Sequence, residues 1–412
     1  MNRRSFVKAI SAGTLGTAVL ARGVEQVFGR EKHPVAPSDQ VRLGIIGPGS
    51  RGQELMRHFL RVPGVKITGL CDIYEPRFAA ARKITGEETP IYRDHRRLLE
   101  ARDLDAIVVA TPLSLHAQHV IASLQSGRHV YGEKSLGLTL GDCNKIVAAV
   151  RQAGKHFQVG HQYRYAPWIH EVIERVGKGE IGRVSHIYGY WHRNGSWRRP
   201  VPDPKFERLI NWRLYKEYSG GLMAELGSHQ IDFANWFFGA MPESVTGSGG
   251  IDSYHDGRET DDNVQVTFRY PGGRSFTFSS LTDNAKAGAA TWIYGKDGSV
   301  EVTMEDAIFY YEPKRAGSPG SEVMERGVST GATYSTKGEM PYRGPGSPVK
   351  IPEGTGGNPN QLACKSFIES LRNNARPFAD ERVGWESGVS VCIANQAIAA
   401  GHRITFADHV KT

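Results

Sequence analysis

Three short stretches of this sequence carry residues whose types and spacing suit chemistry on a small molecule. The first is Gly47-Pro48-Gly49-Ser50-Arg51-Gly52, which follows an apolar run and precedes a helical pattern. Its glycines permit a tight turn that brings backbone N–H groups to a pyrophosphate at a helix N-terminus. Asp72 ends the next apolar run, where a carboxylate binds ribose hydroxyls and repels a 2′-phosphate. The stretch predicts an NAD site, with NADP less favoured, although a structural turn also fits the glycines alone.

The second stretch consists of two separate segments, each of which directly follows an apolar run later in the chain. ATPLSLH (110–116) contains Thr111, Pro112 and His116, and YGEKSLGLT (131–139) contains Glu133 and Lys134. Ligands of open parallel sheets bind outside the carboxyl ends of the strands. We therefore expect the Lys134 ammonium to point into the cofactor crevice. A solvated loop lysine is the commoner fate of this residue type.

The third stretch is GGLMAELGSHQIDFANWFFG, residues 220–239. On a helix, Glu225 and His229 lie four residues apart on one face, with Asp232 about a turn further. A histidine beside an orienting carboxylate suits a general base. A helical ion pair or a metal site fits the same spacing, and spacing alone favours the ion pair. We predict no metal site.

The elements before residue 160 must place the first two stretches. Short β-branched runs (VRLGII, VKITGLC, AIVVA, HVYGE, HFQVG) alternate with helical patterns. Such alternation is typical of a parallel sheet covered on both faces. We predict a Rossmann dinucleotide-binding domain, a doubly wound parallel sheet, over residues 37–160.

The pattern changes after Gly160. Strands with clean alternation, such as NVQVTFRY, RSFTFSSL, TWIYG and SVEVTM, follow one another without helices between them. This favours an α+β substrate domain over 161–412 with an open, mainly antiparallel sheet. Its free face predicts a homo-oligomer, a dimer or tetramer. A loop rich in Gly, Pro and Ser (313–360) is a functional or mobile segment.

The first 36 residues read as a leader and linker. Arg3 and Arg4 precede Ser5, Phe6 and a short, weakly apolar run, as in twin-arginine export signals. We therefore expect a periplasmic or otherwise exported protein that meets the twin-arginine export machinery and keeps or loses its leader. The four cysteines lack CxxC spacing, which favours buried free thiols.

The composition narrows the possible partners. The 412 residues carry a formal net charge of +8. No basic patch is interleaved with aromatic residues, so nothing predicts nucleic-acid binding. No run approaches the roughly 20 apolar residues of a membrane span.

The order of these motifs resembles the Gfo/Idh/MocA oxidoreductases. The resemblance rests on G-x-G-x-x-G, the TP…H turn, E-K, GHQYRY (160–165), GEIGRV (179–184) and G-G-x-x-x-E-x-G-x-H-x-x-D. It implies that Lys134 contacts the nicotinamide ribose and the reacting hydroxyl, and that His229 is the catalytic histidine. The family's E-K-P proline is Ser135 here, and Glu225 stands where many members have Asp. Both departures concern the substrate geometry.

The resemblance also supplies contact residues. Trp212-Arg213 resembles a pair near the cofactor in some members, and Gln162 belongs to the GHQYRY motif, which we assign to the cofactor site. Aromatic and polar residues that could stack on and hydrogen-bond a pyranose are Tyr163, Arg164, Trp191, His192, Asn194 and Trp197.

An exported enzyme cannot draw on a free NAD pool. The leader therefore predicts a tightly bound cofactor that is reset within each cycle. The favoured interpretation is an NAD-dependent oxidoreductase acting on a sugar or glycoside hydroxyl. One alternative is a glycoside hydrolase like the NAD-dependent glycosidases of family 109, which act by oxidation, elimination, hydration and re-reduction. Another is a non-catalytic sugar or redox sensor on the same fold.

Overall fold

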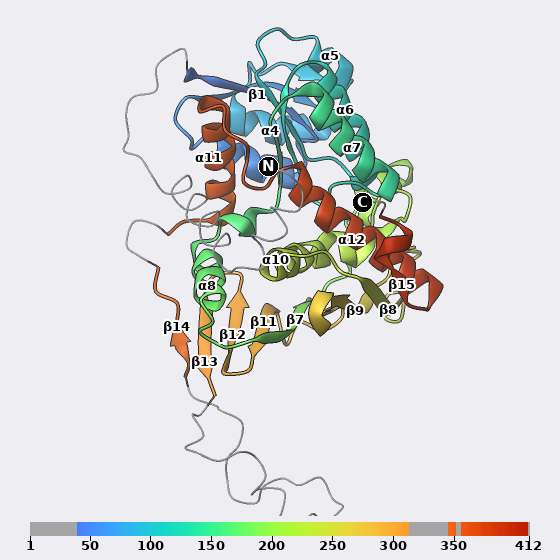
Figure 1. Cartoon of the computed structure of the whole chain (residues 1–412). Helices are drawn as coiled ribbons and strands as arrows, with labels where there is room; N and C mark the ends of the chain where they lie inside the picture. Colours follow the sequence, from blue (N-terminus) through green and yellow to red (C-terminus); the bar gives the residue numbers. More distant parts are fainter. Residues whose placement is uncertain (1–38, 313–344, 352–355, 411–412) are drawn as a thin grey trace, which may run out of the picture.

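The computed structural model describes residues 39–312, 345–351 and 356–410 (Figure 1). The predicted leader and most of the predicted 313–360 loop lie outside these residues. Two sheets account for most of the described strands. In Figure 1 they lie at opposite ends of the molecule, with helices between and around them.

The first sheet is a six-stranded parallel sheet, as predicted. Its order is β3-β2-β1-β4-β5-β6, and each pairing is parallel. The strands are β1 (Val41–Ile46), β2 (Val65–Cys71), β3 (Ile91–Tyr92), β4 (Ala106–Val109), β5 (His129–Gly132) and β6 (Phe157–Val159). The helices are α3 (Ser50–Phe59), α4 (Pro76–Thr85), α5 (His95–Leu99), α6 (His116–Gln125) and α7 (Leu140–Ala153). All four residues of β4 are buried, as expected for a strand covered on both faces.

The second sheet has nine strands in the order β14-β13-β12-β11-β7-β10-β9-β8-β15. The strands are β7 (Val184–His192), β8 (Ser244–Gly250), β9 (Asn263–Tyr270), β10 (Arg274–Leu281), β11 (Ala289–Gly295), β12 (Gly298–Thr303), β13 (Ala307–Tyr311), β14 (Ser347–Pro348) and β15 (Ile404–Thr405). β7 and β10 pair in parallel, whereas the other pairings are antiparallel. The predicted fold class is therefore confirmed.

Helices cover one face of this second sheet. They are α8 (Pro167–Gly177), α10 (Ser228–Phe238) and α12 (Glu381–Ala400). α12 also contacts α7, so it joins the two sheets (Figure 1). On the other face the aromatic rings of Trp292 and Tyr294 stack, and Tyr294 is 40% exposed.

The last part of the chain returns to the first sheet. α11 (Pro359–Arg372) packs on α3, and Phe367 contacts the rings of Phe59 and Tyr131. The boundary at residue 160 stays a prediction, but α11, which it assigns to the second domain, shares the core of the first. Local pattern cannot show this because the partner helix is some 300 residues away.

The described cysteines are free and buried, as predicted. Desolvation raises the pKa of Cys71 to about 12. Among the helices described, none is both long and apolar enough to cross a membrane. No cluster of His, Cys, Asp and Glu in the described residues is arranged to hold a metal ion.

Candidate active site

Two cavities adjoin at the carboxyl ends of the parallel strands. The larger, of about 660 Å³, lies beside the glycine turn and Asp72, and the smaller, of about 240 Å³, beside Lys134 and His229. They share the lining residues Arg51, Ala110, Thr111, Trp212 and Arg213. The two therefore form one crevice with a dinucleotide end and a reaction end.

The glycine turn joins β1 to α3. Gly47 has φ +90, and a Cβ there would lie 2.7 Å from the Ala110 carbonyl oxygen. A Cβ on Gly52 would lie 2.3 Å from the Gly47 carbonyl oxygen, so this position needs glycine for close packing. Gly49, Ser50 and Arg51 line the larger cavity. A Cβ on Gly49 would meet nothing closer than Arg77, at 3.8 Å, which leaves room for a pyrophosphate to approach the backbone.

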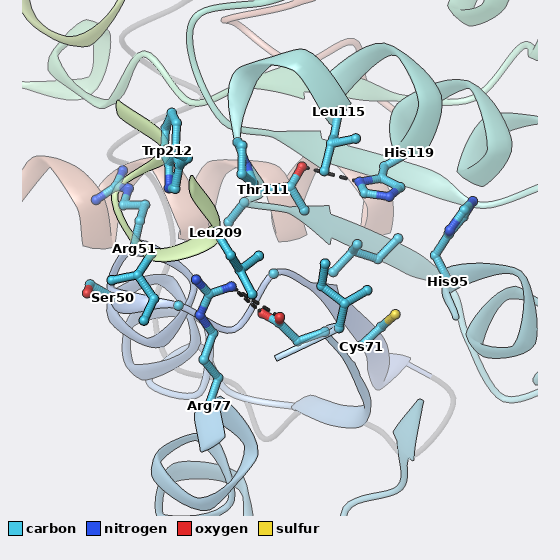
Figure 2. Close-up of a pocket in the computed structure, with 18 of the residues that line it drawn as sticks. Ser50, Arg51, Cys71, Arg77, His95, Thr111, Leu115, His119, Leu209 and Trp212 are labelled. Atoms are coloured by element: carbon cyan, nitrogen blue, oxygen red, sulfur yellow. Dashed lines mark hydrogen bonds and ion pairs between the residues drawn. The ribbon is translucent and has the colours of Figure 1, made fainter. Parts of the chain in front are cut away.

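Asp72 lies at the end of β2, where the sequence predicts a ribose ligand. It lines the larger cavity and accepts hydrogen bonds from the Tyr74 N–H (2.8 Å) and from the Arg77 guanidinium (3.0 and 3.1 Å). Figure 2 shows the Arg77 contact as dashed lines. The sequence analysis missed Arg77. Arg77 could have been predicted as a partner of Asp72 from its position five residues later, in the first turn of the next helix.

The loops after β4 and β5 are joined by His116. Its Nδ1 lies 2.9 Å from the Ser135 carbonyl oxygen and its Nε2 lies 3.1 Å from the Thr111 carbonyl oxygen. Burial lowers the pKa of His116. Pro112 and Thr111 line the larger cavity. His116 lines the smaller one. Its neutral ring carries one N–H, which can donate to one of the two carbonyl oxygens, and the ring lies between the two loops.

Arg51 and Glu133 pair between the two ends of the crevice. Arg51 Nε donates to Glu133 Oε1 at 2.9 Å, and Arg51 also bonds Asn360 on α11 (2.8 Å). Its Nη2 is buried without a partner among the described residues. A Cβ on Gly160 would lie 2.7 Å from Glu133 Oε1. The orphan Nη2 is a donor that a cofactor oxygen can satisfy.

Lys134 reaches into the smaller cavity. Its Nζ donates to the carbonyl oxygens of Ala224 (3.1 Å) and Glu225 (2.6 Å). An ammonium has three N–H donors, so one remains for a substrate oxygen. Burial lowers the pKa of Lys134, while the charges of Glu225 and Glu133 oppose that shift.

Glu225 and His229 line the same cavity, but no hydrogen bond joins them in the described structure. The helix carries a π turn over Met223–Gly227 before α10. Such a turn takes an extra residue, so the four-residue spacing no longer pairs these side chains as it would in a regular α-helix. Arg213 Nε instead donates to Glu225 at 2.7 Å. Glu225 orienting His229 is therefore an expectation that the structure corrects.

Glu225 stays ionised although it is buried. Desolvation alone would raise the pKa of this carboxyl, but the positive charges of Arg213 and Lys134 outweigh it, so the pKa falls below its usual value. Glu225 is thus ionised, and its carboxylate is paired with Arg213.

His229 is a buried histidine at the reaction end. Its Nδ1 has no hydrogen-bond partner among the described residues. Its ring lies 5.2 Å from Tyr163, 5.8 Å from Trp191 and 5.8 Å from His161, measured between ring centroids. Burial, and the charge of Lys134 after it, hold the pKa of His229 well below the usual value. A neutral imidazole in this setting can accept a proton.

The predicted sugar contacts separate into two groups. Trp191 lines the reaction end, as does Gln162, which was predicted as a cofactor contact, and Tyr163 packs on His229. Arg164 lies elsewhere: its guanidinium is buried, bonds Asp232 at 2.8 and 3.0 Å and stacks on Trp236. Asn194 forms an isolated bridge to Asp283. The Trp197 ring lies against the guanidinium of Arg193 in a cation–π contact.

None of Arg164, Asn194 and Trp197 is among the described residues that line either cavity. Arg164 was predicted to contact a sugar, but its side chain instead forms an ion pair. The lining residues that the sequence missed, besides Arg77, include Arg199, Leu209 and Ile210 of the second domain.

Family models match both parts of the chain. Residues 41–161 match the oxidoreductase family with an NAD-binding Rossmann fold, Gfo/Idh/MocA. Residues 169–301 match the Gfo/Idh/MocA C-terminal domain. Together the matches span more than half of the chain.

Curated relatives are similar over part of their length. An uncharacterized oxidoreductase of Streptococcus pneumoniae is 31% identical over 229 residues, which are 55% of this chain and 58% of the relative. A 2,7-anhydro-N-acetylneuraminate hydratase of Mediterraneibacter gnavus is 30% identical over 228 residues, 55% of this chain and 57% of the relative. The chain thus spans less than two thirds of these relatives.

Solved structures share the fold. An aldose-aldose oxidoreductase from Caulobacter crescentus, complexed with glycerol, has a TM-score of 0.69 at 19% identity, over 89% of this chain and 99% of that one. A levoglucosan dehydrogenase in complex with NADH and levoglucosan has a TM-score of 0.70 at 17% identity, with the same coverage.

Proposed function

Because this chain belongs to the Gfo/Idh/MocA family of NAD-binding oxidoreductases, we propose that it oxidises a hydroxyl group of a sugar or glycoside. The observation that carries the proposal is the reaction end itself. Lys134 keeps a free N–H, burial keeps the His229 imidazole neutral, and both residues line one cavity next to the dinucleotide end. Structural relatives include a levoglucosan dehydrogenase bound to NADH.

The residues present fit the cofactor. The glycine turn at the start of α3 would hold the pyrophosphate, Asp72 would hold the ribose hydroxyls, and Arg51 and Trp212 line the passage to the reaction end. When bound, NAD supplies the hydride acceptor.

The chain's own side chains handle the proton. The free N–H of Lys134 donates to the reacting hydroxyl and stabilises the negative charge that develops on its oxygen. His229 accepts the hydroxyl proton, because its imidazole is neutral at ordinary pH. Glu225, paired with Arg213, offsets the charge of Lys134. Positioning of the two reactants supplies the remaining rate acceleration.

A second candidate is a reaction with no net oxidation. Its support is the similarity to the 2,7-anhydro-N-acetylneuraminate hydratase, together with a base and an acid group in one cavity. Oxidation of a ring carbon would acidify the neighbouring C–H, elimination would cleave the glycosidic bond, and water addition and re-reduction would complete the cycle.

One experiment separates these candidates. The purified protein is incubated with matched pairs of free sugars and aryl glycosides, and products are identified by mass spectrometry. Reduction of the bound NAD, with a keto sugar that accumulates once a second substrate re-oxidises the cofactor, supports the oxidoreductase. A released aglycone without net NADH supports the glycosidase. Saturable binding of sugars with neither product would leave the non-catalytic sensor.

We also propose export by the twin-arginine route to the periplasm, on the basis of Arg3-Arg4 and the following apolar run. The bound NAD would travel with the folded protein and be reset in each cycle, either by a second substrate or by the same molecule. Fractionation of cells expressing the full chain tests this, with Arg3→Lys/Arg4→Lys as the matched control. Cytoplasmic location of both proteins would contradict it.

The free face of the second sheet supports self-association as a dimer or tetramer. Its exposed aromatic residues, such as Tyr188 and Tyr294, are the kind of surface that oligomers bury. Sedimentation of the protein at micromolar concentration tests this proposal, and a pure monomer would contradict it.

A further inference from the structure

A segment of the second domain lies over the dinucleotide end of the crevice. We define this cover segment as residues 193–218, which contain the short turns Pro204–Phe206, Glu207–Ile210 and Trp212–Leu214. Five of its side chains line the larger cavity: Arg199, Leu209, Ile210, Trp212 and Arg213. In Figure 2, Leu209 and Trp212 extend from this segment toward the cavity above Arg77 and Ser50.

The cover segment is fastened to its own domain. Arg198 bonds Asp256 outside the segment (3.1 Å) and also pairs with Glu207 within it. Arg208 pairs with Glu259 at 2.8 Å. The carbonyl oxygen of Leu214 accepts from the Glu259 N–H at 2.7 Å. These bonds make the cover segment an ordered part of the second domain.

Polar and aromatic contacts join the cover segment to the first domain. Arg199 Nη1 donates to Ser50 Oγ at 3.2 Å, and the Phe206 ring meets the Tyr74 ring edge-on at 5.1 Å. At the far end, the Tyr218 carbonyl oxygen accepts from the Ser114 N–H at 3.2 Å. Ser50 lies in the glycine turn, and Tyr74 lies between Asp72 and Arg77 in the chain, so the first two contacts tie the cover segment to both parts of the dinucleotide end.

Two adjacent arginines differ in a way that points to a ligand. Arg198 is paired with two carboxylates. Arg199 has no carboxylate partner in the described structure, and its backbone is held in place by Asn211, which accepts from its N–H at 2.7 Å and donates to its carbonyl oxygen at 3.0 Å. Asn211 itself is 3% exposed. A buried side chain thus fixes an unpaired cation at the glycine turn, where the pyrophosphate binds.

We propose that the cover segment is a retention device for the dinucleotide: Arg199 binds the pyrophosphate from the second domain, and the Phe206–Tyr74 contact closes the exit beside it. The inference rests on the proposed function, because it concerns the same NAD. Release then requires the cover segment to part from the first domain, so its contacts set the rate of release rather than the rate of hydride transfer. This accounts for a cofactor that survives outside the cytoplasm.

The test measures release directly. Purified full-length protein is saturated with radiolabelled NAD⁺ and chased with an excess of unlabelled NAD⁺, and retained label is followed with time. Arg199→Gln is expected to release roughly 10- to 100-fold faster, the range for loss of a hydrogen bond to a charged group. Phe206→Ala is expected to release about 2- to 10-fold faster.

Matched variants guard the interpretation. Arg193→Gln removes an arginine of the same segment that lies over Trp197, and it should release at the wild-type rate. Phe206→Leu keeps apolar bulk and should fall between wild type and Phe206→Ala. Melting temperatures are compared for every variant without nucleotide, so that unfolding is not mistaken for release.

The outcomes are distinguishable. If folded Arg199→Gln and Phe206→Ala release label as slowly as wild type, or if wild type itself exchanges as fast as they do, the retention device is wrong while NAD binding stands. The nucleotide that co-purifies with wild type is quantified before labelling; if wild type holds no nucleotide and also binds no label, the proposed function fails.

Discussion

The two ends of the crevice are built in different ways. The dinucleotide end rests on consecutive elements, β1, its glycine turn and α3, with Asp72 following on β2. The reaction end is assembled from distant parts: Lys134 follows β5, while Glu225 and His229 come from a π turn and a helix of the second domain. The core of the dinucleotide end is one local motif that the second domain covers, whereas the reaction end has no local core and depends wholly on how the two domains meet.

The largest effect is expected at the reaction end. Lys134→Ala removes the N–H that donates to the reacting oxygen, so turnover should fall by roughly 10³-fold or more. Bound nucleotide should remain, because the glycine turn and Asp72 are untouched. Steady-state rates and the nucleotide content of the denatured protein check both parts. Lys145→Ala, an exposed lysine on α7, is the control, and a Lys134→Ala protein with normal turnover would remove this residue from the mechanism.

The next effect concerns the support beneath the reaction end. Arg164→Leu leaves Asp232 buried without its partner, which should lower the free energy of unfolding by about 3–5 kcal/mol. Arg164→Leu/Asp232→Leu removes both charges and should recover much of that loss. Denaturant unfolding of the three proteins measures this. If the single variant lost little free energy of unfolding, Arg164 would not be a structural ion-pair partner. That result would favour the predicted sugar contact.

The glycine turn and Asp72 of the dinucleotide end, and the two sheet types, could be predicted from the sequence, whereas the side chains that the second domain adds to that end could not. The apolar runs, the glycine spacing and Asp72 are local patterns, and the strands they predict are present. The bond between Arg213 and Glu225 could not be predicted, because helical spacing assumes a regular α-helix and this one contains a π turn. The role of Arg164 was misjudged for a related reason: only the fold shows that Asp232 is its neighbour. That Lys134 and His229 meet was implied by the family resemblance rather than by periodicity.

A smaller effect separates packing from binding within the glycine turn. Gly52→Ala would place a Cβ 2.3 Å from a backbone oxygen, so it should destabilise the fold by about 1–3 kcal/mol. Gly49→Ala meets open space, so its melting temperature should stay near wild type while NAD affinity falls. Thermal melts and nucleotide titrations compare the two. Equal melting temperatures would show that the turn relaxes more easily than this structure implies.

The smallest effect is a predicted absence of change. The pKa of His229 lies well below its usual value because burial and the charge of Lys134 disfavour the imidazolium. A base stays active above its pKa, so protonation of His229 should not reduce kcat as pH falls from 8 to 6. A pH–rate profile of the nucleotide-loaded protein checks this. An acidic limb with a pKa near the ordinary histidine value of about 6.5 would contradict a buried, neutral base.

The central claim is that this chain holds NAD as a resident cofactor for chemistry on a sugar hydroxyl. The most direct measurement is the nucleotide content of the protein purified from the cell envelope, denatured and analysed by chromatography and mass spectrometry. The account predicts close to one NAD⁺ or NADH per chain, retained through purification without added nucleotide. An empty protein that also fails to bind added NAD⁺ would contradict it.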